Sequence, residues 1–87
     1  MEINVIEDKK GRLVFELHGE GHGFCNALKS ALWQQKGVKV AGYNVDHPLT
    51  GVPTFVVEAD NPRAALKAAA EQLKKDLDEL AKEVKKL

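Results

Sequence analysis

Apolar and polar residues alternate near the start of the chain in a way that predicts a β-hairpin. Over residues 12–18 the apolar positions recur with the period of a half-buried strand: Leu13, Phe15 and Leu17. Ile3 and Val5 alternate with polar neighbours in the same way, although less completely. The charged segment 8–11 lies between these runs and ends in Gly11, which can adopt the positive φ of a tight turn. We therefore expect two antiparallel strands joined at 8–11.

The stretch from about Phe24 to Gln35 predicts an amphipathic helix, which Gly37 would end. Its apolar residues fall within a stripe about 120° wide, typical of a helix face that packs on a core: Phe24, Cys25, Leu28, Ala31 and Leu32. Trp33 projects almost opposite Phe24. It is either a lone exposed aromatic residue or an anchor for another chain, and the pattern favours neither.

Two further strands are predicted after this helix. In 38–45, Val38 and Val40 are in phase, but the phase then changes to Tyr43, which predicts a bulge near Gly42. The run 54–59 is rich in β-branched residues and nearly all apolar. Such a run is typical of a central strand that is covered on at least part of both faces.

The last segment predicts one long helix, from about 62 to 87. Asn61 and Pro62 provide an N-cap residue followed by proline at the first helical position. Apolar residues then recur at steps of four and three, the pattern of a helix that packs along another helix: Leu66, Ala70, Leu73, Leu77, Leu80, Val84 and Leu87. At 1.5 Å per residue such a helix is about 38 Å long, so its end should project beyond a small sheet.

These elements together predict an α+β fold of order ββαββα. We expect a four-stranded antiparallel sheet with both helices on one face, forming a single domain over residues 1–87. A chain of 87 residues buries only about 60% of the surface that its unfolded form exposes, so a partner is plausible.

Composition narrows the functional classes. Thirteen basic residues balance thirteen acidic ones, without a basic cluster, which disfavours direct nucleic-acid binding. The single Cys25 cannot form a disulfide within the chain and fits a reducing compartment, so a cytoplasmic location is expected. No apolar run approaches the roughly 18 residues that a membrane span needs.

Residues 19–25 contain two suggestions of site chemistry, and each is weak. Three glycines in 19–23 could cradle a phosphate, but the spacing of a dinucleotide site and the Lys-Ser/Thr of a P-loop are absent. His22 and Cys25 form one close pair, whereas a closed zinc site needs four ligands. Cys25 lies on the apolar stripe, where a thiol is inert. We therefore predict no catalytic residue, no metal and no cofactor.

Several short motifs resemble the small L subunit of archaeal RNA polymerase. They are EGHGFCN at 20–26, the spaced Leu28, Ser30 and Leu32, VAGY at 40–43 and HPL at 47–49. That family is similar to the eukaryotic eleventh-subunit proteins and, more distantly, to the amino-terminal domain of the bacterial alpha subunit. The likeness extends over nearly the whole chain. Its motif falls on His22, Asn26, Leu28, Ser30, Leu32, Gly42, Tyr43, His47, Pro48 and Leu49.

The resemblance implies a noncatalytic assembly subunit. In that family the first and last helices pack against the equivalent helices of the larger, alpha-like D subunit, and the two large catalytic subunits assemble on this heterodimer. The interface positions that the resemblance and the helix patterns imply here are Phe24, Asn26, Leu28, Leu32, Trp33, Leu73, Leu77, Leu80 and Val84.

The chain departs from the family pattern at the start of the first helix. An acidic residue usually precedes the motif histidine and Thr-Leu-Gly follows it, whereas this chain has Gly21 and then Gly23-Phe24-Cys25. Losing the threonine removes a side-chain cap that contributes about 1 kcal/mol. This divergence keeps an alternative open, in which the chain is a self-associating helix-and-sheet module with an unrelated ligand-binding or enzymatic role.

Overall fold

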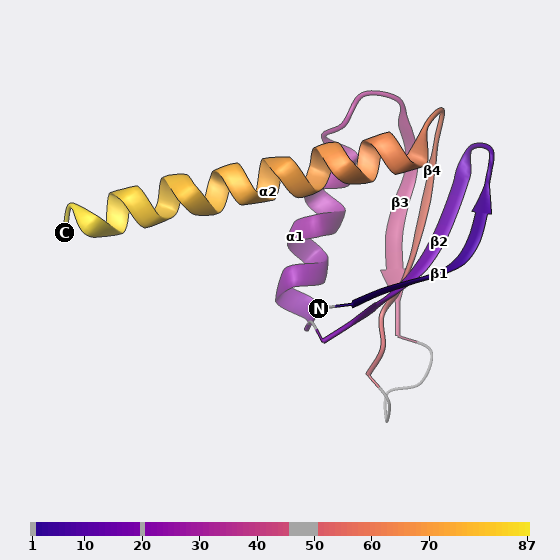
Figure 1. Cartoon of the computed structure of the whole chain (residues 1–87), viewed down its shortest axis with the longest axis horizontal. Helices are drawn as coiled ribbons and strands as arrows, with labels where there is room; N and C mark the ends of the chain where they lie inside the picture. The colour runs from indigo at the N-terminus through magenta and orange to yellow at the C-terminus, as the bar shows by residue number, and fades with distance from the viewer. Residues whose placement is uncertain (1, 20, 46–50) are drawn as a thin grey trace.

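The computed structural model describes residues 2–19, 21–45 and 51–87. The described residues form six elements in the order β1 (Glu2–Lys9), β2 (Arg12–His18), α1 (His22–Trp33), β3 (Val38–Asn44), β4 (Thr54–Ala59) and α2 (Pro62–Lys85). All strand pairs are antiparallel, and the strands lie in the sheet in the order β1-β2-β4-β3 (Figure 1). The predicted ββαββα fold is therefore confirmed, with β4 as a central strand.

The core lies between one face of the sheet and the two helices. Alternate residues of β2 and β4 point to this face, and Phe15 pairs with Phe55 across the two strands, with their rings stacked at 5.2 Å between centroids. Both phenylalanines are completely buried. The helices complete the core with Cys25, Leu28, Ala31, Leu32 and Ala69. Both helices therefore cover the same face of the sheet.

The turn between β1 and β2 is tighter than the sequence predicted. Lys9 pairs with Arg12, which leaves only Lys10 and Gly11 in the turn, and Gly11 has a φ of +84°. A bulge in β1 between Val5 and Glu7 changes which residues of that strand face the helices.

The predicted bulge near Gly42 is wrong, because the register shift in β3 lies between Val38 and Val40. From Val40 to Asn44 each residue pairs in unbroken register with β4. The bulge lets Ala41 and Tyr43 face the core, whereas Val40 points to the other face of the sheet and is 40% exposed. The phase change is real, but it occurs earlier in the strand than the sequence suggested.

Helix α1 begins and ends two residues before the predicted bounds of 24 and 35. Gly21 is its N-cap and provides no side-chain hydrogen bond, while its carbonyl accepts from the Cys25 N–H at 3.1 Å. Gln34 caps the other end. Gly37, with a φ of +85°, lies in the turn that leads to β3.

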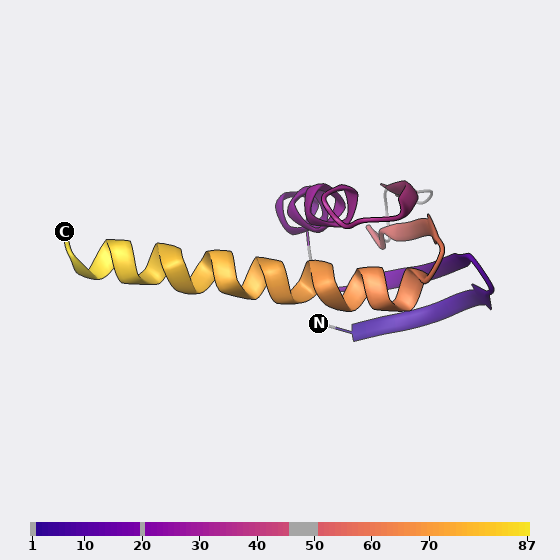
Figure 2. The same cartoon turned by 90° about the horizontal axis from the view of Figure 1, so that it is seen from above.

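Helix α2 is anchored at its start and uncovered at its end. The Asn61 side chain accepts a hydrogen bond from the Ala64 N–H at 3.2 Å, as predicted for a cap. The Arg63 guanidinium donates to the Asp8 carboxylate of β1, and this hydrogen bond lowers the pKa of Asp8. Pro62, Ala65 and Ala69 are buried, but every residue from 74 onward is exposed. Figures 1 and 2 show this end projecting past α1 and the sheet, as the length of the predicted helix implied.

Candidate partner interface

An apolar groove of about 390 Å³ opens beside the two helices and the N-terminal hairpin. Its walls come from β1, β2, α1 and α2, and are made by Ile3, Leu17, Phe24, Leu28, Leu66, Ala70, Leu73, Lys74, Leu77 and Asp78. All but Lys74 and Asp78 are apolar. A concave apolar surface with two charged side chains at its border is suited to bind an apolar side chain or helix of another protein.

The wall formed by β1 was not predicted as part of an interface. Ile3 pairs with Leu17 and Val5 with Phe15, so both β1 residues lie on the helix side of the sheet. They are nevertheless 50% and 46% exposed, since the two helices lie over the other strands. The alternation of these residues in the sequence indicates a strand. It does not indicate that no helix lies over this part of the sheet face.

The groove continues into a row of exposed apolar residues on the free end of α2. We call Leu77, Leu80 and Val84 the distal stripe; they are 61%, 59% and 56% exposed. Leu77 belongs to both the groove and the stripe, so the two form one continuous apolar surface. Contiguous exposed surface of this kind marks a protein interaction site far more often than scattered single apolar residues do.

Three of the family-motif residues meet where α1 begins beside β3. The Tyr43 hydroxyl donates to the Asn26 side-chain oxygen at 3.2 Å and lies 3.1 Å from the His22 Nδ1, from which it can accept. The Tyr43 ring also stacks on Phe55, with centroids 5.2 Å apart. Tyr43 therefore joins the exposed polar side chains of α1 to the buried aromatic core.

Other motif positions are less informative. A Cβ added to Gly42 would meet nothing within 4 Å, so the structure gives no steric reason for glycine there. The motif residues His47, Pro48 and Leu49 lie outside the described residues.

The residues predicted for the partner interface divide among several environments. Phe24, Leu28, Leu73 and Leu77 line the groove, although Leu28 is only 5% exposed, and Leu80 and Val84 lie on the distal stripe. Leu32 is completely buried in the core of this chain, and Asn26 is engaged with Tyr43. The role of all the predicted residues at an interface stays a prediction.

Trp33 occupies a surface separate from the groove. It is 49% exposed and does not line the groove. It follows Phe24 by nine residues, which places it about half a turn round α1 from that groove residue. If Trp33 contacts another chain, it does so from a different side of α1.

The fold does not bring the residues that weakly suggested site chemistry together into a site. Cys25 is completely buried in the core, whereas His22 is exposed and contacts Tyr43. Within residues 2–19, 21–45 and 51–87, no three His, Cys, Asp or Glu residues lie together so that they could hold a metal ion. No helix in the same part of the chain is long and apolar enough to cross a membrane.

Comparison with known proteins places these features in a family. The profile of the RNA polymerase Rpb3/Rpb11 dimerisation domain matches residues 12–83. The DNA-directed RNA polymerase subunit Rpo11 of Methanothermobacter thermautotrophicus is 39% identical over 85 residues, covering 98% of this chain and 100% of the relative. The Rpo11 subunit of Pyrococcus furiosus is 39% identical over 89 residues, covering 97% and 90%.

A solved structure has the same fold. The crystal structure of the DNA-directed RNA polymerase subunit L from Thermoplasma acidophilum matches with a TM-score of 0.85 at 23% identity, covering 98% of this chain and 86% of that one. The match extends over the sheet and both helices.

Proposed function

Because the chain belongs to the RNA polymerase Rpb3/Rpb11 dimerisation domain family, we propose that it is a noncatalytic assembly subunit of an archaeal RNA polymerase. It forms a heterodimer with the larger, alpha-like D subunit, and this heterodimer is the platform for the two large catalytic subunits. Its place of action is the cytoplasm, which suits its single Cys25. Its net charge of zero suits a subunit without direct contact to nucleic acid.

The observation that carries this proposal is the continuous apolar surface of the groove and the distal stripe. Each residue of the stripe leaves more than half of its surface in water. Removing these side chains from water would stabilise a complex by on the order of 1 kcal/mol or more each. Nothing within the described part of the chain covers them, so a second protein is the natural source of that cover.

The alternative of a self-associating module with an unrelated ligand or enzymatic task has no support from the comparisons. The relatives reported above carry the names of RNA polymerase subunits. The structural relative is named as RNA polymerase subunit L.

Co-expression with the D subunit of the same organism tests the proposal. We expect the two chains to co-purify and to elute as a 1:1 complex in size-exclusion chromatography. The variant Leu77→Gln/Leu80→Gln should lose most of this complex, because it replaces exposed apolar contacts without adding charge. The control Lys75→Gln/Lys82→Gln introduces the same two residues on the outer side of α2 and should retain the complex. A chain that forms a stable homodimer and leaves the D subunit unbound would overturn the proposal.

A further inference from the structure

Charged residues are distributed unevenly beside the distal stripe. Asp76 and Glu83 immediately precede Leu77 and Val84 and are seven residues apart, so they lie in line along one edge of the stripe. We call this pair the acidic edge. The opposite edge is formed by Lys74 and Ala81, which follow the apolar Leu73 and Leu80, and there the acidic Asp78 is balanced by Lys74. The two edges of the same apolar surface therefore differ in charge.

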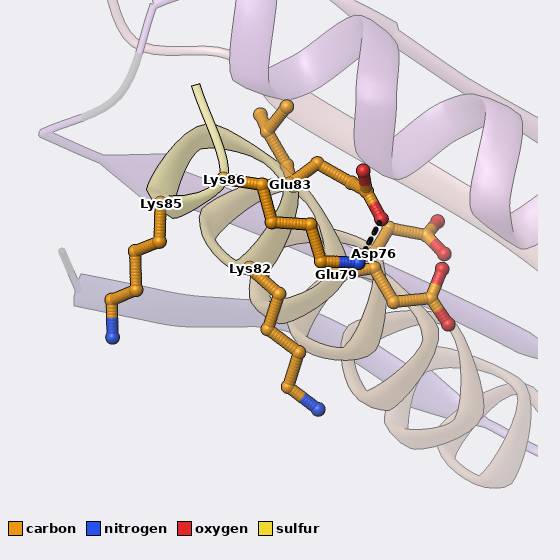
Figure 3. Close-up of a pocket in the computed structure, with 7 residues that line it drawn as sticks. Asp76, Glu79, Lys82, Glu83, Lys85 and Lys86 are labelled. Carbon is orange, nitrogen blue, oxygen red and sulfur yellow. Dashed lines mark hydrogen bonds and ion pairs between the residues drawn. The ribbon is translucent and has the colours of Figure 1, made fainter.

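The side chains at the end of α2 follow this division. In Figure 3 the carboxylates of Asp76, Glu79 and Glu83 gather on one side of the helix, whereas Lys82 and Lys85 project to another side. Glu83 pairs with Lys86 at 3.4 Å, but both side chains are about 70% exposed, where an ion pair contributes little. Asp76 accepts a hydrogen bond from the Gln72 amide at 2.9 Å. This donor is uncharged, so it does not balance the charge of the Asp76 carboxylate. The acidic edge thus retains negative charge for a partner to meet.

This arrangement disfavours pairing of α2 with a second copy of itself. In an antiparallel pair related by a two-fold axis, equal edges meet, so Asp76 and Glu83 would face the same carboxylates of the copy. Like charges placed opposite each other at an interface are destabilising and reject that partner. In a parallel pair the acidic edge would face the uncharged Ala81 of the copy. Neither arrangement places a Lys or Arg side chain of the copy opposite the acidic edge.

We propose that the distal half of α2 selects its partner by charge as well as by apolar contact. Its partner is a helix of the D subunit that covers the distal stripe and presents Lys or Arg side chains to Asp76 and Glu83. The acidic edge also keeps free chains from pairing through α2. This inference rests on the proposed heterodimer and states the chemistry of the surface that α2 meets there.

Charge reversal at the acidic edge and away from it tests the inference. The edge variant is Asp76→Lys/Glu83→Lys, and the control is Asp60→Lys/Glu71→Lys, which makes the same change in net charge away from the stripe. All four side chains are exposed, so both variants should retain the circular dichroism spectrum of the wild type. Binding to the purified D subunit is then measured by surface plasmon resonance at about 50 mM and about 500 mM salt.

We expect the edge variant to bind about tenfold more weakly than the wild type at low salt, with much of the loss in the association rate. The control should change less than about twofold, and the difference between the variants should shrink at high salt because mobile ions screen exposed charges. Equal loss in both variants, or no loss in the edge variant, would overturn the charge inference while the heterodimer stands. A wild-type chain that does not bind the D subunit would overturn both.

Discussion

Tyr43 shows how a single side chain can connect motif positions that are far apart in the sequence. Its hydroxyl contacts His22 and Asn26 on α1, while its ring stacks on Phe55 of the central strand. Gly21 provides no side-chain cap at the start of α1, so these contacts help to hold that end of the helix against β3. The family resemblance implied His22, Asn26 and Tyr43 as motif residues, but only the fold shows that they touch.

The contribution of the Tyr43 hydroxyl can be measured with Tyr43→Phe. We expect the free energy of unfolding to fall by about 1 kcal/mol or less, because the lost hydrogen bonds are exposed to water. Tyr43→Ala should cost about 2 kcal/mol or more, since it also removes the stacking on Phe55. Urea unfolding followed by circular dichroism measures both. If the Phe and Ala variants are equally destabilised, the hydroxyl and not the ring holds this joint.

Trp33 offers a second test at the scale of one residue. It is half exposed, so Trp33→Asp should leave the circular dichroism spectrum of the isolated chain unchanged. We expect the variant to bind the D subunit more weakly, because a large aromatic side chain at an interface often dominates the binding energy. Titration calorimetry with the D subunit measures the change, and Lys36→Asp is a control at an exposed residue nearby. Equal binding by Trp33→Asp and wild type would place Trp33 outside that interface.

At the scale of elements, the patterns that depend on near neighbours in the sequence were predicted well. The alternation of Leu13, Phe15 and Leu17 identifies β2 because each residue reports directly on the face it occupies. Asn61 and Pro62 identify the start of α2 because capping is local chemistry. The order of the elements and the fold class follow from such signals.

Features that depend on a distant strand or helix were predicted poorly. The bulge in β3 was misplaced because its position is set by the register with β4, which the sequence of β3 alone does not contain. The exposure of Ile3, Val5 and Ile6 was missed because alternation shows that a strand has an apolar face, but not whether a helix covers it. The same gap explains why the interface was predicted on the two helices alone, whereas the groove is lined by four elements.

At the scale of the whole molecule, the chain consists of a packed body with an unpacked extension. Its extents are 44 × 34 × 17 Å, and the free end of α2 extends along the longest axis in Figures 1 and 2. The first turns of α2 pack through Ala65 and Ala69, whereas the residues from 74 onward rely on helix propensity and local charge pairs. A helical segment of that length without tertiary contacts is only marginally stable in water.

Hydrogen exchange can compare these two halves of α2 directly. In the free chain we expect amides in 74–85 to exchange much faster than those in 65–73, because opening the distal turns exposes no buried core. Binding of the D subunit should slow exchange in 74–85 strongly, since a partner over the distal stripe makes opening of the helix costly. The amides of β4 serve as the internal control, because that strand is already central in the free chain and should change little. Distal amides that exchange at the same rate with and without the D subunit would mean that the partner does not cover this half of the helix, and the groove alone would then carry the interface.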